Sequence, residues 1–374
     1  MAGIYIHIPF CKQACFYCDF HFSVNRKLQG EIVQAICKEI VLNNKYLKET
    51  EIRSIYFGGG TPSLLSEEEL NSIMQSVFKN FPISSSAEIT LEANPDDITD
   101  EKVKVWNRQG INRLSIGIQS FRDQDLKWMN RAHNSNEALK AAQIAKDNGI
   151  ENLSLDLIYG IPDMDKEAWI SNIEQALSLN PTHLSCYSLT VEEDTPLYKL
   201  IATNRAKAPL EGEASKQFTV LMDIMKEKGW EHYEISNFCK PGHEAVHNSN
   251  YWNGIPYLGI GPSAHSYNGV SRQWNVSHNL KYLEALNKGE IPMEMETLSE
   301  EDVINEYILV SLRTNKGCDL ERIQELDANG ISTVERAVLP YINDGSVLQM
   351  GSILYLTEKG KQIADRIASD LFVG

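Results

Sequence analysis

The sequence contains no apolar run approaching the roughly 18–20 residues that a helix needs to cross a bilayer. Its start lacks the apolar core of a secretory signal, because charged and polar residues interrupt it. Cysteine is sparse: seven residues among 374, an odd number that does not suit a disulfide framework. These absences predict a cytoplasmic chain that has no transmembrane segment and whose thiols stay reduced and available to a metal.

Basic residues are in the minority. Lysine and arginine total 35 against 51 aspartate and glutamate residues, which gives a formal net charge of −16. Such a balance disfavours a broad phosphate-contacting surface, so we expect no nucleic-acid partner, although a local basic pocket is compatible with it. Hydrophobic residues make up 42% of the chain, which is ordinary for a globular protein, and 374 residues allow two or three domains.

Three of the seven cysteines are concentrated near the start of the chain. Cys11, Cys15 and Cys18 form a Cys-x3-Cys-x2-Cys pattern. Thiolates are the usual ligands of the four irons in a [4Fe–4S] cluster, so three thiolates from one loop leave one iron open. Zinc, the alternative, usually takes a second pair of cysteines or histidines downstream, and the sequence shows no such pair. The pattern therefore favours a cluster with a vacant position. The remaining cysteines are isolated, as small buried hydrophobes are: Cys37, Cys186, Cys239 and Cys318.

Strand-like and helical segments alternate up to Ser188. The predicted strands are Gly3–Ile8, Ile52–Phe57, Glu88–Glu92, Arg113–Gly117, Asn152–Leu157 and His183–Ser188. The predicted helices are Gln29–Lys48, Glu67–Asn80, Asp100–Gln109, Asn136–Asn148 and Lys166–Leu179. Ser66 and Glu69 form a capping box that supports the start of the second helix. Strands separated by helices imply parallel pairing through right-handed crossovers, and hence an α/β layer or partial barrel.

Polar residues recur where these strands end. They are Cys11, Gly58-Gly59-Gly60-Thr61-Pro62, Glu92, Gln119, Asp156, Tyr187 and Ser188. In α/β sheets and barrels, ligands bind at the carboxyl ends of the strands. We therefore expect one ligand site along one rim of the sheet. The glycine run lacks the lysine of a nucleotide-binding P-loop, so a triphosphate is not indicated.

The rest of the chain is less regular. We expect a barrel over residues 1–208, a loop-rich connecting region over 209–297 and a small C-terminal domain over 298–374. The connecting region has one clear helix, Glu213–Lys228, and then an aromatic stretch. The C-terminal domain reads as three helices, a short hairpin and a final helix, which resembles a winged helix. The acidic balance disfavours a DNA-binding role for it.

The cysteine pattern, with an aromatic residue before its last cysteine, resembles that of the radical S-adenosylmethionine (SAM) superfamily. The start Tyr5-Ile6-His7-Ile8-Pro9-Phe10-Cys11 is similar to the branch that contains oxygen-independent coproporphyrinogen III oxidases and the HemW haem chaperones. The resemblance implies a partial (β/α)6 barrel in which Cys11, Cys15 and Cys18 hold a [4Fe–4S] cluster. It also implies that the vacant iron binds SAM.

The same resemblance implies further contacts to SAM. In the family, the GGGTP element (here Gly59, Gly60 and Thr61) contacts the amino-acid end of SAM. An arginine suits its carboxylate, and acids and an amide at strand ends suit ribose hydroxyls. The implied SAM-binding residues are Tyr5, Tyr17, Gly59, Gly60, Thr61, Glu92, Gln119, Arg131 and Asp156. Without the resemblance, a salt bridge or a cap explains each charged or amide residue equally well, and packing explains Tyr17.

The run His247-Asn248-Ser249-Asn250-Tyr251-Trp252 matches the HNxxYW element of the HemW family, which is associated with haem. The resemblance implies that His247 ligates haem iron, with Tyr251 and Trp252 covering the macrocycle. On spacing alone, a histidine hydrogen-bonded within a folded loop is the simpler interpretation. The sequence has no Cys-x-x-Cys-His, so it does not support covalent c-type haem attachment.

Two functions follow from the resemblance. The first is a haem chaperone that binds a cluster, SAM and haem, and transfers haem to an acceptor protein. The alternative is an oxygen-independent oxidase that decarboxylates coproporphyrinogen III to protoporphyrinogen. That oxidase has a fourth cysteine two places after the third, where this chain has Asp19-Phe20, and a substantial segment before the cysteines, where this chain has ten residues. The HemW interpretation is therefore favoured.

Overall fold

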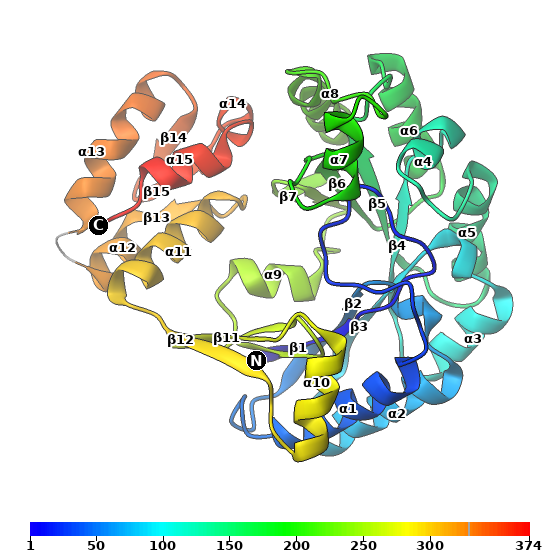
Figure 1. Cartoon of the computed structure of the whole chain (residues 1–374). Coiled ribbons are helices and arrows are strands. Elements are labelled where there is room, and N and C mark those ends of the chain that lie inside the picture. The colour runs from blue at the N-terminus through cyan, green and yellow to red at the C-terminus, as the bar shows by residue number, and fades with distance from the viewer. Residues whose placement is uncertain (328–329) are drawn as a thin grey trace.

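The computed structural model describes residues 1–327 and 330–374 (Figure 1). Its centre is a run of six parallel strands: β1 (Ala2–Ile8), β2 (Ile52–Gly59), β3 (Ile83–Ala93), β4 (Arg113–Gln119), β5 (Asn152–Tyr159) and β6 (His183–Ser188). The helices that link them are α1 (Gln29–Leu42), α2 (Glu67–Asn80), α3 (Asp100–Arg108), α4 (Asp123–Trp128), α5 (Ser135–Asp147) and α6 (Lys166–Ser178). Two 3-10 turns, η1 (Pro62–Leu64) and η2 (Pro95–Asp97), follow β2 and β3.

All six predicted strands and the five predicted helices between them are confirmed. The capping box at the start of α2 is also present, with the Ser66 side chain accepting from the Glu69 N–H. Two boundaries differ by five residues or more: β3 begins at Ile83 and not at Glu88, and α1 ends at Leu42 and not at Lys48. The chain turns after Asn43, and Lys48 and Glu49 adopt positive φ angles that a helix does not allow. Leu47 is still buried there, which explains why the apolar pattern runs past the helix end.

The segment from 209 to 297 differs from the predicted loop-rich region because it adds six strands to the same sheet. These are β7 (Glu231–Glu234), β8 (Asn237–Cys239), β9 (Tyr257–Ile260), β10 (His265–Tyr267), β11 (Ser271–Asn275) and β12 (Met293–Thr297). Helix α7 (Pro196–Ala202) precedes this segment, and the helices within it are α8 (Glu213–Glu227), α9 (Val246–Trp252) and α10 (Asn279–Lys288). The strand order is β12-β11-β10-β9-β1-β2-β3-β4-β5-β6-β8-β7. Strands of three to five residues are too short for a period-2 pattern to be recognised in sequence.

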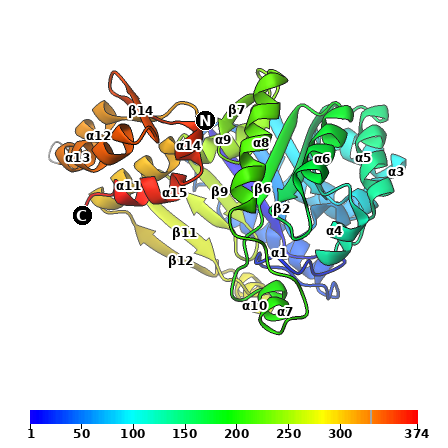
Figure 2. The same cartoon turned by 90° about the horizontal axis from the view of Figure 1, so that it is seen from above.

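The sheet curves, with α1 to α6 along its outer face and α9 against its inner face (Figures 1 and 2). Alternate residues of each central strand serve the two faces. In β3, Ile89 and Leu91 join the hydrophobic core, whereas Glu88, Thr90 and Glu92 carry polar groups on the opposite face. The inner face of the sheet is therefore a polar surface, which suits a ligand chamber better than a packed core.

The C-terminal part of the chain has a separate hydrophobic cluster, which includes Ile308, Leu312 and Ile367. Its elements are α11 (Glu300–Leu312), β13 (Cys318–Asp319), α12 (Leu320–Leu326), α13 (Gly330–Asn343), β14 (Val347–Met350), β15 (Ile353–Leu356), α14 (Glu358–Lys361) and α15 (Ala364–Asp370). The three strands form a second sheet in the order β13-β15-β14. The winged-helix-like character and the three domain boundaries stay predictions. Within the residues that the structure describes, no helix has the length and apolar composition needed to cross a membrane.

Candidate functional site

The loop between β1 and α1 carries Cys11, Cys15 and Cys18, and all three side chains are partly buried. The loop is held by η2, which follows β3, and by Asn130, which follows α4. The Lys12 ammonium donates to Asp96 in η2 at 2.6 Å, and the Asn130 amide donates to the carbonyl of Ala14 at 2.7 Å. The strand-end rim therefore positions the three cysteines, as the parallel topology predicts.

Hydrogen-bond donors face two of the three sulfurs. The Thr61 hydroxyl donates to Cys11 Sγ at 3.4 Å, and Arg131 Nη1 donates to Cys15 Sγ at 3.3 Å. Burial raises the pKa of Cys11 to about 11 and that of Cys18 to about 12, so these thiols are protonated at neutral pH when no metal binds them. Donors aimed at sulfur favour the thiolate that a metal requires.

Arg131 links the cysteine loop to β3 and β4. Its Nη1 also lies 3.4 Å from the Tyr17 hydroxyl, and its Nη2 donates to Asn94 Oδ1 at 2.6 Å and to the Gly117 carbonyl at 2.8 Å. The Asn94 amide in turn donates to Thr61 Oγ1 at 3.3 Å. Arg131 Nε is buried and has no partner among the described residues. The guanidinium is thus held firmly and keeps one donor for a ligand.

The glycine run packs directly against the cysteine loop. Gly59 has φ +103°, and a Cβ there would lie 2.5 Å from the His7 ring. A Cβ on Gly60 would lie 2.6 Å from the carbonyl oxygen of Phe10. The Gly60 N–H also donates to Ile8 at 2.9 Å. Only glycine lets the two backbones approach this closely.

Two of the predicted SAM-binding residues, Glu92 and Asp156, carry carboxyl groups on the inner face of the sheet. Glu92 accepts from the Tyr56 hydroxyl at 2.8 Å, and Asp156 accepts from Ser115 at 3.1 Å and from Ser154 at 3.4 Å. Burial raises the pKa of Glu92 to about 7 and that of Asp156 to about 6, and Asp156 adds to the rise at Glu92. A ligand that offers hydroxyl donors or positive charge would favour the ionised form of both carboxyl groups.

Gln119 and Tyr5 complete the predicted set. Gln119 has φ +66°, at the point where the β4–β5 register shifts, and its Oε1 is buried with no partner among the described residues. A strained backbone and an unpaired buried amide oxygen together indicate a ligand position. The Tyr5 hydroxyl lies 3.2 Å from His7 Nδ1, and its ring stacks on Tyr56 at 6.1 Å between centroids.

His247 lies on α9, not in a loop, and it is 1% exposed. Its Nδ1 lies 2.9 Å from Ser54 Oγ, and its Nε2 lies 2.9 Å from the Tyr251 hydroxyl. The ring stacks on Tyr56 at 5.1 Å. Burial lowers the pKa of His247 to about 3, which keeps the imidazole neutral. Because both nitrogens have partners, His247 could ligate iron only after one of these hydrogen bonds breaks, and this arrangement agrees with the simpler interpretation.

Sequence reasoning missed several residues that hold the site together: Asn94, Asn130, Tyr56, Ser115 and Ser54. Three of them occupy inward positions of β2 and β4, where polar residues alternate with apolar ones. A period-2 alternation of this kind, also visible in Glu88-Ile89-Thr90-Leu91-Glu92, is the signal that predicts a polar inner face. Asn94 follows β3 and Asn130 follows α4. Their partners are distant in sequence, so no local pattern marks them.

The fold and the cysteine loop define a radical SAM protein. Residues 5–176 match the family model of the Radical SAM superfamily. The whole chain resembles the structure of coproporphyrinogen III oxidase (HemN) from Escherichia coli, with a TM-score of 0.87, 22% identity, and coverage of 100% of this chain and 90% of that one. This likeness confirms the predicted α/β radical SAM fold and concerns the fold alone.

Sequence comparison identifies the family within that superfamily. The heme chaperone HemW of Bacillus subtilis is 33% identical over 371 residues, covering 98% of each chain. HemW of Mycobacterium tuberculosis H37Rv is 33% identical over 374 residues, covering 99% of this chain and 94% of that one. HemW of Escherichia coli K12 is 38% identical over 268 residues, covering 70% and 69%. The chain belongs to the HemW family.

Membership of the superfamily implies a [4Fe–4S] cluster and SAM, and the residues present fit both. Three cysteines share one loop, donors face two of their sulfurs, and the amide oxygen of Gln119 is buried without a partner. Among the described residues, no three His, Cys, Asp or Glu side chains are placed around a single metal ion. Ligands that each bind a different iron of a cluster do not need to converge on one point.

Proposed function

We propose that this protein is a haem chaperone that binds a [4Fe–4S] cluster and SAM, binds haem and transfers it to an acceptor protein. The observation that carries this proposal is the 33% identity to a heme chaperone HemW over 98% of both chains. A match over the full length includes α9 and the C-terminal part as well as the barrel. A cytoplasmic location is part of the same proposal and rests on the sequence alone.

In this proposal, Cys11, Cys15 and Cys18 bind three irons of the cluster. Thr61 and Arg131 stabilise the sulfurs through the hydrogen bonds that they already donate to Cys11 and Cys15. When bound, the cluster and SAM supply electron transfer to a sulfonium and the adenosyl radical chemistry that follows. The protein contributes the loop geometry and excludes solvent from the thiolates.

The rim residues bind SAM in the same proposal. Arg131 Nε suits the carboxylate of SAM, and the backbone of Gly59, Gly60 and Thr61 suits its amino-acid end. The carboxylates of Glu92 and Asp156 suit ribose hydroxyls. The residues left to contact the remaining parts of SAM are Tyr5, Tyr17 and Gln119.

The HNSNYW element is the part of the site that we assign to haem. Ligation of iron by His247 stays a prediction. It requires one ring nitrogen to give up its hydrogen bond to Ser54 or to Tyr251 and to bind iron instead. Replacing His247 by alanine tests this prediction directly. A Soret spectrum and haem affinity equal to those of the wild-type chain would remove His247 as a ligand.

The second candidate function is that of an oxygen-independent coproporphyrinogen III oxidase. The likeness to the HemN fold, with a TM-score of 0.87, favours it. The absence of a fourth cysteine in the run Cys18-Asp19-Phe20 argues against it.

One anaerobic preparation separates the two functions. The reconstituted protein is first titrated with haem, and the loaded protein is then mixed with apomyoglobin as a general haem acceptor. A chaperone binds haem and releases it to the acceptor. A separate sample receives SAM and coproporphyrinogen III with a reductant, and steady formation of protoporphyrinogen there would contradict the chaperone proposal.

A further inference from the structure

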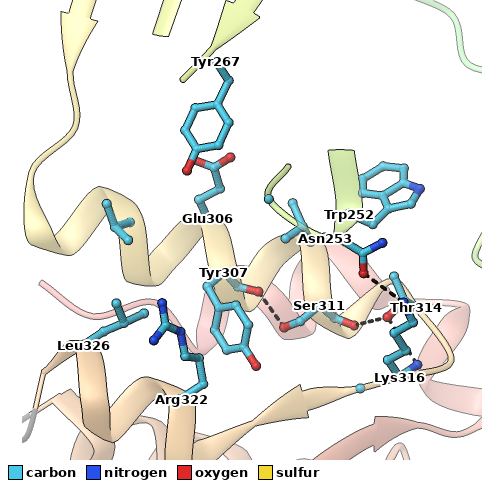
Figure 3. A pocket seen from close by; sticks show the side chains of 14 residues that line it. Trp252, Asn253, Tyr267, Glu306, Tyr307, Ser311, Thr314, Lys316, Arg322 and Leu326 are labelled. Atoms are coloured by element: carbon cyan, nitrogen blue, oxygen red, sulfur yellow. Dashed lines mark hydrogen bonds between the residues drawn. The ribbon is translucent and has the colours of Figure 1, made fainter. Parts of the chain in front are cut away.

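A cavity of about 350 Å³ lies between the end of α9 and helix α11 (Figure 3). Trp252 and Asn253 line it from α9, and Tyr267 lines it from β10. The other side is formed by Tyr307 of α11 and by residues near β13 and α12. Its volume is within the range of about 300–1,000 Å³ that is typical of small-molecule sites.

This cavity lies on a different side of α9 from His247. His247 and Trp252 are five residues apart, which places them roughly 140° apart around the helix. His247 contacts Ser54 and Tyr56 on β2, whereas Trp252 lies under the guanidinium of Arg313 at 5.4 Å. The HNSNYW element therefore has one residue that anchors α9 to the sheet and another that faces the C-terminal part.

The cavity combines aromatic surface with positive charge. Trp252, Tyr267 and Tyr307 provide the rings, and Lys316 and Arg322 provide the cations. Together, the rings and the cations suit a flat ligand that carries carboxylates.

The two cations of the lining are available to an anionic ligand. Lys316 donates to Asn253 at 2.9 Å and has no carboxylate partner in the part of the chain that the structure describes. Arg322 pairs with Glu325 on its own helix at 2.8 Å, and exposed pairs of this kind contribute little. The acidic residue of the lining, Glu306, is already paired with Arg272. In a chain of net charge −16, this local positive lining favours a carboxylate-bearing ligand.

We propose that this cavity binds the carboxylate-bearing edge of haem, an inference that rests on the proposed chaperone function. Lys316 and Arg322 pair with the two propionates, and the rings of Trp252 and Tyr307 contact the macrocycle. The cavity is smaller than a whole haem, so the opposite edge stays accessible to an acceptor protein. Recognition of the propionates at this cavity does not depend on whether His247 ligates the iron.

The test compares haem with iron-free protoporphyrin IX, which has the same ring and carboxylates but no metal. Both are titrated into the full-length wild-type protein and into the double variant Lys316→Glu/Arg322→Glu. Loss of two charge-assisted hydrogen bonds predicts at least ten-fold weaker binding of both porphyrins. The control is Lys45→Glu/Lys281→Glu, which makes the same change in net charge at exposed lysines outside the cavity and is expected to bind as the wild-type chain does.

Three results would overturn this inference, and they differ in what they say of the proposed function. If the wild-type chain binds neither porphyrin, the chaperone proposal fails as well. If the wild-type chain binds haem and the double variant binds it as tightly as the control does, haem lies elsewhere and the chaperone proposal stands. If haem binds, protoporphyrin IX does not, and only His247→Ala abolishes binding, the site depends on axial ligation at His247. Val310→Trp fills the cavity and gives a check that does not depend on charge. It is expected to weaken the binding of both porphyrins.

Discussion

Replacing Gly60 by alanine tests whether the glycine run positions the cysteine loop. A Cβ at this residue would lie 2.6 Å from Phe10 O, 2.8 Å from Ile8 O and 2.8 Å from Phe10 N. All three are backbone atoms, so no side chain can rotate away to make room. Gly60 has no positive φ, and alanine therefore adds crowding without adding backbone strain. The variant isolates the steric contact between the turn and the loop.

The size of the displacement follows from these distances. Ordinary van der Waals contact of a Cβ begins at 3.4 Å, so the nearest atom must move by about 0.8 Å. Overpacking of this kind costs about 1–3 kcal/mol when the surroundings do not yield. The loop can yield by lifting away from β2, and this movement carries Cys11 with it. We therefore expect a loss of up to about 1–3 kcal/mol in the free energy of unfolding and a larger loss in cluster retention.

The assay measures iron and acid-labile sulfide per chain after anaerobic reconstitution, and then the rate of iron release to a chelator. Urea unfolding of the cluster-free protein measures the stability change separately. Gly30→Ala is the matched control, because a Cβ at that residue of α1 meets nothing within 4 Å. It is expected to load as the wild-type chain does, with stability equal or up to about 1 kcal/mol higher. If Gly60→Ala holds iron and sulfide as well as Gly30→Ala does, the close approach is not what positions Cys11.

Two further substitutions test the charge state of the rim and the support of the sheet. Because the pKa of Glu92 is raised to about 7, SAM affinity measured by calorimetry on the reconstituted protein is expected to rise between pH 6 and 8 as the carboxylate forms. Glu92→Gln should bind SAM more weakly and lose that rise, and an unchanged pH profile in the variant would show that another group titrates. Glu39 is fully buried and accepts from the Tyr282 hydroxyl and from the Gly261 N–H, so Glu39→Ala removes the acceptor of both buried donors and should cost roughly 3 kcal/mol in urea unfolding. Glu31→Ala, at an exposed position of the same helix, should change stability by less than about 0.5 kcal/mol, and equal losses in the two variants would contradict the reasoning.

The central strands could be predicted because each is long enough to show its pattern and the first five are separated from the next strand by a clear helix. β7 to β12 could not be predicted in this way. They are short, and their pairing depends on neighbours far along the chain. β9 pairs with β1, more than 250 positions away in sequence, and no local signal marks that partnership. Contacts of this kind are decided by tertiary packing and not by propensity.

The rim of the site was predictable for a related reason. Parallel strands bring their carboxyl ends to one edge, so polar residues after consecutive strands have to meet there. What remained hidden is the set of residues that connect them. Asn94 bridges Arg131 and Thr61, at separations of 37 and 33 positions, and its amide has no sequence feature that separates it from an ordinary turn residue. A family resemblance can predict which residues bind a ligand. A residue that only connects them, such as Asn94, is found from the structure.

The HNSNYW run shows what a motif leaves undecided. Its letters predict a histidine near aromatic rings, and the structure has both. They do not predict that α9 forms, nor how it is rotated, and the rotation decides which chemistry each side chain can perform. His247 faces Ser54 and has both nitrogens occupied, so its contribution in this conformation is to fix the helix. Trp252 lies under the guanidinium of Arg313 and lines the same cavity as Lys316. If haem binds on the Trp252 side, the two ends of the motif have different roles. Trp252 contacts haem, and His247 acts indirectly, by fixing the position of α9.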